Sequence, residues 1–91
     1  GAALQRALAQ RYTGERFVTV KPLGDPQGLR AAGGFFDVTA DNDTNRADLF
    51  VFASDEQALL VARLDNLGKG ASGSAVQVLN VHLGIEEARG L

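Results

Sequence analysis

Two neighbouring apolar segments constrain the fold of this chain more than any other feature. Residues 48–53 read DLFVFA and residues 58–64 read ALLVARL, with four polar residues between them. Apolar runs of this length, joined by so short a polar connection, predict a β-hairpin. Apolar side chains occupy both alternating sets of positions in each run, so both faces of the hairpin are apolar. Such a hairpin needs cover on two sides.

Shorter elements are expected on the N-terminal side of the hairpin. Residues 1–14 show helical spacing of apolar side chains before a glycine, which predicts a helix that ends at Gly14. The expected apolar face of this helix consists of Leu4, Ala7, Leu8 and Tyr12. The segments RFVTVKP (16–22) and FFDVTA (35–40) predict strands, and residues 23–34 between them predict a loop rich in glycine.

A second helix is predicted at the C-terminal side. The segment SAVQVLNVHLG (74–84) has helical periodicity and ends at Gly84. Its expected apolar face consists of Ala75, Val76, Leu79 and Leu83. We expect the two helices to cover one face of the hairpin and another domain or subunit to cover the other. A small closed fold that buries both faces is the alternative. The predicted class is α/β, in the form of an α+β fragment.

Composition excludes several classes of function. The chain of 91 residues has no Cys, no Met, no Trp and one His. It therefore lacks thiol nucleophiles, thiolate metal sites, disulfides and multi-histidine metal clusters. Nine basic against eleven acidic residues leave no positive excess for nucleic acid, and no apolar run is long enough for a membrane span. A start at Gly1 without any Met indicates a processed chain or a piece of a longer one.

The segment GKGASG (68–73) matches the pattern G-x-G-x-x-G between a predicted strand and a predicted helix. Asp65, Asn66 and Leu67 lie between that strand and the first glycine, and no second strand follows to place Glu86 or Glu87 as the acidic partner. We therefore favour an anion-binding helix N-terminus with Lys69 beside it over a true dinucleotide fingerprint. A plain turn capped by Ser72 or Ser74 remains the structural alternative.

The remaining polar motifs carry no clear chemistry. The segment DNDTN (41–45) begins like a calcium loop, but Arg46 and Phe52 stand where such a loop needs Gly and Glu, so a turn built on Asx side chains is expected. Solvated loop positions are also expected for the four nearby acids, Asp37, Asp41, Asp43 and Asp48. The single histidine, His82, is expected to be structural or exposed. No catalytic residue is identified in the chain.

A family resemblance extends over most of these elements. The segments FDVTADNDTNRADLFVF and ALLVARLDNLGKGASGSAVQVLNVHLG resemble the C-terminal part of the N-acetyl-gamma-glutamyl-phosphate reductases of arginine biosynthesis. Residues 65–73, continuing through Ala75, Gln77 and Asn80, are similar to the C-terminal signature of that family. The tail EEARGL resembles the family's ending, and residues 1–34 fit the preceding helix, strand and loop.

The resemblance implies a function that this chain performs only as part of a larger enzyme. The family reduces an acyl phosphate to an aldehyde with NADPH, through a thioester on a Cys that is absent here. It implies that residues 1–64 end the α/β catalytic and oligomerisation domain, and that residues 65–91 form a turn and a helix that packs on a Rossmann domain. Asn66, Lys69 and Gly70 are then expected to line the NADP site.

The implied partners are the N-terminal remainder of the same enzyme and further copies of it in a homo-oligomer, and the implied location is the cytoplasm. The isolated chain is expected to be inactive and to expose surfaces that the complete enzyme covers. The alternative function is a non-catalytic dimerisation or interaction module derived from that domain. A small nucleotide-binding module built on GKGASG is a third hypothesis, and the missing second strand counts against it.

Overall fold

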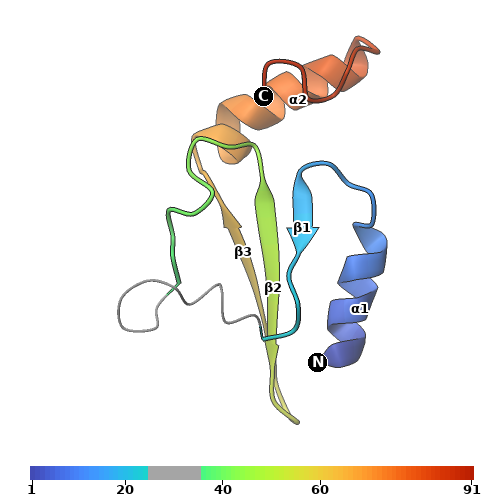
Figure 1. Cartoon of the computed structure of the whole chain (residues 1–91), viewed down its shortest axis with the longest axis vertical. Coiled ribbons are helices and arrows are strands. Elements are labelled where there is room, and N and C mark those ends of the chain that lie inside the picture. Colours follow the sequence, from blue (N-terminus) through green and yellow to red (C-terminus); the bar gives the residue numbers. More distant parts are fainter. Residues whose placement is uncertain (25–35) are drawn as a thin grey trace.

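The structure, a computed structural model, describes residues 1–24 and 36–91 (Figure 1). It contains two helices and a three-stranded mixed sheet, so the predicted α/β class is confirmed. Most of the expected loop over 23–34 lies outside the described residues. In chain order the elements are α1 (Ala2–Arg11), β1 (Val18–Val20), β2 (Ala47–Ala53), β3 (Ala58–Leu64), a π-helical turn (Gly68–Ser72) and α2 (Gly73–His82).

The sheet has the order β1-β2-β3, with β1 parallel to β2 and β2 antiparallel to β3. The predicted hairpin is confirmed: Ala53 pairs with Ala58 at the turn, and Ala47 pairs with Leu64 at the far end. The strand predicted within 16–22 is confirmed as β1, which reaches β2 from a distant part of the sequence.

The strand predicted over 35–40 is wrong for the residues that the structure describes. Residues 38–43 form turns instead. Asp37 explains the change, because its Oδ1 accepts hydrogen bonds from the backbone N–H of Thr39 at 3.1 Å and from the Thr39 hydroxyl at 2.8 Å. A side chain that bonds its own backbone in this way competes with strand pairing. A turn is confirmed within 41–45, and Asp43 adopts a φ of 61° there. The recorded side-chain bond of this turn comes from the Thr44 hydroxyl to the Asp41 carbonyl at 2.6 Å and not from an Asx side chain as expected.

The two faces of β2 are covered by different parts of the chain. Helix α1 packs against β1 and β2, and Gly1, which caps its N-terminus, lies close to Ala53 on the face that also carries Val51. On the other face, the Phe36 ring meets the rings of Phe50 and Phe52 edge-on, at centroid distances of 5.2 and 5.6 Å. Phe50 and Val51 are the fully buried apolar side chains in the described part of the chain.

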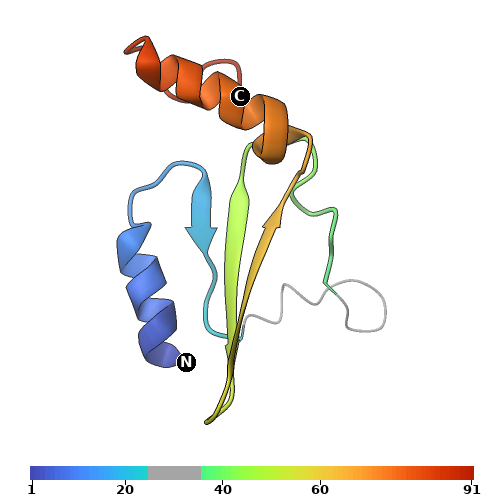
Figure 2. The same cartoon turned by 180° about the vertical axis from the view of Figure 1, so that it is seen from behind.

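The expectation that two helices cover one face of the hairpin is wrong. Helix α2 runs across one end of the sheet, while α1 lies along β1, as Figures 1 and 2 show from opposite sides. The predicted apolar face of α2 is not buried either, because Leu79 and Leu83 are exposed; the helix buries Gly73 and Asn80 instead. The stop predicted at Gly84 is confirmed, because this glycine has a positive φ and directly follows the last cap residue of α2, Leu83. The helix α1 ends earlier than predicted, at Arg11, and Gly14 adopts its positive φ in the turn that follows.

Candidate functional site

The glycine-rich segment connects the end of β3 to α2 through a wide turn. Asp65, Asn66 and Leu67 separate β3 from the π-helical turn, which continues directly into α2. Asp65 organises this connection: its Oδ1 accepts from the backbone N–H of Leu67 at 2.9 Å, and its Oδ2 accepts from that of Asp43 at 2.8 Å. These backbone hydrogen bonds lower the pKa of Asp65 below its ordinary value.

This geometry bears on two interpretations of the motif GKGASG, the dinucleotide fingerprint and the turn capped by a serine. A dinucleotide fingerprint needs a tight turn from strand to helix, and the three intervening residues prevent it. The π-helical turn begins at Gly68, ahead of both serines, and Ser72 stands at the N-cap position of α2 without making a side-chain cap hydrogen bond. Ser72 instead donates its hydroxyl hydrogen to the Leu67 carbonyl at 3.0 Å. The serine cap, the structural alternative for this turn, is therefore wrong.

The predicted cofactor residues occupy two environments. Asn66 and Gly70 are exposed and adjacent, so close that a side-chain carbon at Gly70 would stand 3.0 Å from the Asn66 Oδ1. Lys69 is half-buried and its ammonium is turned elsewhere: Nζ donates to the Gln77 Oε1 at 2.6 Å and lies 5.4 Å from the centre of the Phe17 ring. The recorded contacts thus bring Asn66 and Gly70 together, and they join Lys69 to neither.

Gln77 is the centre of the contacts that hold Lys69. Its Oε1 also accepts from the Asn45 Nδ2 at 2.9 Å, and its Nε2 donates to the Glu87 Oε1 at 2.7 Å. Asn80 fixes the tail that carries Glu87, because its Nδ2 donates to the backbone carbonyls of Glu87 and Arg89, each at 2.9 Å. One polar network therefore ties the first turn of the helix to the end of the chain. Gln77 and Asn80 both belong to the segment that carries the family resemblance.

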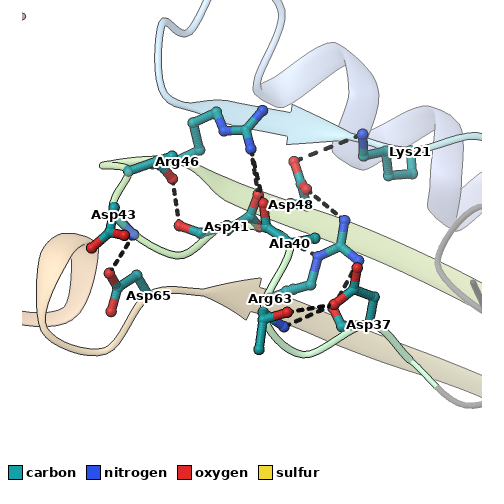
Figure 3. A network of polar contacts seen from close by, with 11 residues as sticks. Lys21, Asp37, Ala40, Asp41, Asp43, Arg46, Asp48, Arg63 and Asp65 are labelled. Atoms are coloured by element: carbon teal, nitrogen blue, oxygen red, sulfur yellow. Dashed lines mark hydrogen bonds and ion pairs between the residues drawn. The ribbon is translucent and has the colours of Figure 1, made fainter. Parts of the chain in front are cut away.

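A second polar network fills the space between the hairpin and the segment that precedes it (Figure 3). Asp41 and Asp48 are almost fully buried, with 1% and 3% exposed, and Arg63 of β3 joins them. The Arg63 Nη2 donates to the Asp48 Oδ2 at 2.9 Å, and its Nε donates to the Asp41 Oδ2 at 3.4 Å. Arg46 supplies a further contact, from Nη2 to the Asp41 Oδ1 at 3.0 Å. The expectation that these acids are solvated is wrong for Asp41 and Asp48.

Burial sets the protonation behaviour of Asp41. Loss of solvent raises its pKa, and the hydrogen bond and negative charge of Asp48 raise it further, against the opposing charges of Arg63 and Arg46. The network holds Arg63 at 4.9 Å from the centre of the Phe50 ring, so it is part of the packing of the sheet. Its two carboxylates are paired with cations, and the arrangement is that of a structural ion cluster.

One feature of the sequence points to this cluster. Arg63 is the single charged residue in the run ALLVARL, and the hairpin register places it directly opposite Asp48. Opposite charges facing each other on neighbouring strands are a recognised stabilising pair. Asp41 could not be assigned in this way, because its position depends on the turn at 37–43.

No group of three or more His, Cys, Asp or Glu that could hold a metal ion occurs in residues 1–24 and 36–91. His82 is exposed at the end of α2. Among the helices of the same described residues, none has the length and apolar character needed to cross a membrane.

Comparison with known proteins finds relatives that share one name, N-acetyl-gamma-glutamyl-phosphate reductase. The chain is 57% identical over 93 residues to N-acetyl-gamma-glutamyl-phosphate reductase 2 of Nostoc sp., a match that covers 100% of this chain and 29% of the relative. The reductase of Trichormus variabilis matches at the same identity and coverage. The reductase of Burkholderia ambifaria is 46% identical over 90 residues, 97% of this chain and 27% of the relative. No family model matches the chain.

The chain thus spans less than a third of the length of the relatives that it matches, which fits a C-terminal portion of such an enzyme. The aligned region covers all or nearly all of the chain, so it includes the hairpin and the turn that leads into α2. Along its length, this chain is homologous to one part of the N-acetyl-gamma-glutamyl-phosphate reductases.

Proposed function

We propose that the chain works as the C-terminal portion of an NADP-dependent reductase that converts N-acetyl-glutamyl phosphate to N-acetyl-glutamate semialdehyde. The observation that carries this proposal is the 57% identity to the Nostoc reductase along the whole chain. The chain has no Cys, so the thiolate that attacks the acyl phosphate belongs to the part of the enzyme outside these residues. By itself the chain is therefore inactive.

In this function the two parts of the chain have different tasks. Residues 1–64 complete the α/β catalytic and oligomerisation domain, and residues 65–91 return to the NADP-binding domain through the turn and α2. The exposed side chains of Leu79 and Leu83 fit such a packing surface. The enzyme is a homo-oligomer in the cytoplasm.

The turn that precedes α2 fits one side of an NADP site. Asn66 exposes a side-chain amide next to Gly70, whose missing side chain leaves that amide accessible. Lys69 adds a positive charge at the same turn, held by Gln77 at 2.6 Å. When bound, NADPH supplies the hydride of the reduction. Asn66, Lys69 and Gly70 would hold its nicotinamide or phosphate side.

A chimeric reductase tests these residue roles. In it the 91 residues replace the matching 93 of the Nostoc enzyme. We expect Asn66→Ala and Lys69→Ala to raise the KM for NADPH about 2- to 10-fold, the effect of losing one hydrogen bond worth about 0.5–1.5 kcal/mol. Asn42→Ala, another exposed asparagine, is the matched control and should change neither KM nor kcat. Unchanged kinetics for Asn66→Ala and Lys69→Ala would remove these residues from the cofactor site.

The same chimera separates the enzyme from the interaction-module hypothesis. A module without catalytic purpose would leave the chimera folded and oligomeric but without NADPH oxidation. The proposed function requires turnover of N-acetyl-glutamyl phosphate with this segment in place.

A further inference from the structure

Strand β3 forms one edge of the described sheet, and its side chains are exposed on both faces. The sheet order places β3 outermost, next to β2 alone. Leu59 is 58% exposed on one face and Leu60 is 53% exposed on the other. Its partner strand β2 contains the two fully buried apolar side chains, so burial falls sharply from one strand to the next.

The pairing with β2 shows which backbone groups of β3 point outward. The hairpin closes with the Ser54 N–H donating to the Gln57 carbonyl at 2.8 Å. Hydrogen-bonded and non-hydrogen-bonded pairs alternate from there, so Leu59 and Val61 turn their backbone N–H and C=O toward β2. Leu60 and Ala62 turn theirs away from it.

The other side of β2 agrees with this assignment. Leu49 lies opposite Ala62 in the register, and its carbonyl accepts from the Lys21 N–H of the β1 side at 2.8 Å. Because Leu49 directs its backbone away from β3, its partner Ala62 directs its own away from β2. The backbone groups of Leu60 and Ala62 therefore lie along the outer edge of the sheet.

A largely apolar groove of about 440 Å³ lies beside the C-terminal half of this strand. It is lined by residues 61–64, Asn66, Phe36 and Val38. Figures 1 and 2 both show the segment that contains residues 36–40 running beside β3, beyond its outer edge. The groove therefore combines outward backbone groups with apolar walls, which is the requirement for strand addition.

The edge lacks the usual protection against pairing. Sheet edges are normally blunted by Pro, by Lys or by other charges that face solvent. The strand ALLVARL contains neither Pro nor Lys, and the guanidinium of its one charged residue, Arg63, is engaged by Asp41 and Asp48. Within residues 1–24 and 36–91 this edge has no further strand paired to it, and its composition does not oppose pairing.

We propose that β3 pairs with an additional strand from the part of the reductase polypeptide that lies outside these 91 residues. This inference rests on the proposed function. The relatives are more than three times as long as the matched segment, which makes their remaining residues the occupant that is always present at high effective concentration. Because Leu59 and Leu60 are exposed on opposite faces, the added strand is apolar on both faces, as a strand in the interior of a sheet is.

Amide hydrogen exchange in the chimeric reductase, followed by mass spectrometry at single-residue resolution, tests the added strand. We expect the amides of Leu60 and Ala62 to exchange at least ~100-fold more slowly than those of Asp55 and Glu56 in the hairpin turn, because pairing protects them. Val61, which bonds to β2, is the internal standard for a protected amide. Exchange of Leu60 and Ala62 as fast as the turn would overturn the proposal.

Two further outcomes would also contradict the proposal. Protection of Leu60 and Ala62 that disappears on dilution would identify a second copy as the occupant, and equal protection in the 91-residue chain alone would identify a segment of the chain itself. Ala62→Pro gives an independent measurement, since it removes the outward N–H but no hydrogen bond to β2. It should lower the melting temperature of the chimera as Val61→Pro does, and an unchanged temperature would count against the added strand.

Hydrogen exchange and turnover of the chimera distinguish a failure of the added strand from a failure of the proposed function. An active chimera with fast-exchanging Leu60 and Ala62 would retain the function and reject the added strand. An inactive chimera with protected amides at Leu60 and Ala62 would retain the added strand and reject the catalytic function.

Discussion

Gly73 shows how closely single residues determine the geometry at the start of α2. A methyl group there would overlap the Asn45 Oδ1 and would lie 2.8 Å from the Gly68 carbonyl oxygen. The Asn45 Oδ1 is buried beside Gly73, and its close approach leaves no room for a side chain at this position. The sequence identified Gly73 as part of a glycine motif, but its structural task is close packing against the loop at 41–46.

Gly73→Ala should therefore destabilise the chimera by about 1–3 kcal/mol, the usual cost of overpacking a close contact. Gly70→Ala is the matched control, because the nearest atom to its new methyl is the end of the movable Asn66 side chain, at 3.0 Å. Urea unfolding of both variants measures the difference. Equal stability of the two variants would show that the packing at Gly73 is loose.

Asp41 should make stability depend on pH in an unusual direction. Its native pKa is raised, first by burial, so the native state binds this proton more tightly than the unfolded chain does. Its contribution to stability is then complete below the ordinary pKa of 3.8 and is lost as the pH rises through the raised native pKa. Asp41→Asn does not ionise, so it should gain stability relative to the parent over that pH range.

Asp37→Asn should change the pH dependence of stability in the opposite direction to Asp41→Asn. The hydrogen bonds from Thr39 lower the pKa of Asp37, so its contribution is present above 3.8 and is lost as the pH falls below it. Melting temperatures of both variants measured across the acid range should move in opposite directions relative to the parent. Parallel curves would contradict the assignment of Asp41 as the buried acid with the raised pKa.

At the scale of elements, sequence patterns predicted the helices and strands whose formation depends on residues close together in the chain. The hairpin, β1 and both helices were identified because period and turn signals act within a few residues. The strand prediction for residues 35–40 was wrong because the Asp37 side chain accepts hydrogen bonds from the backbone N–H and the hydroxyl of Thr39. These bonds favour a turn in a stretch whose apolar residues suggested a strand. For the same reason the burial of Asp41 was missed, since it depends on where that turn delivers it.

Arg63 should be the most important charged residue of the sheet. Arg63→Met leaves Asp41 and Asp48 buried without their shared cation, and removal of one partner from a buried ion cluster costs about 3–5 kcal/mol. Arg16→Met is the matched control, since Arg16 pairs with Glu86 at the exposed surface and should cost only about 0–1 kcal/mol. Urea unfolding of the chimera compares the two, and similar losses would show that the cluster contributes no special stability.

The whole molecule is shaped as a component of something larger. Its extents are 46 × 30 × 15 Å, so it is hardly thicker than one layer of structure. Apolar side chains remain exposed along β3 and along α2, where Val78 is 68% and Val81 is 61% exposed. The motif GKGASG predicted a site, and in the structure its residues form an ordered π-helical turn that continues into α2.

The exposed side of α2 should respond differently in the two contexts. Val78→Lys combined with Val81→Lys should reduce self-association of the isolated chain, measured by light scattering, because it removes an exposed apolar patch. In the chimera the same change should lower the melting temperature, because there the patch is buried. His82→Lys, at an exposed polar position beside it, is the control. A chimera unaffected by the double change would show that α2 is solvated in the enzyme.

The most direct measurement is NADPH oxidation with N-acetyl-glutamyl phosphate by three proteins: the chimeric reductase, the Nostoc enzyme truncated by the matching residues, and the 91-residue chain alone. The account predicts turnover by the chimera and none by the other two. Turnover by the truncated enzyme, or a folded chimera without turnover, would contradict the claim that this chain completes an N-acetyl-gamma-glutamyl-phosphate reductase.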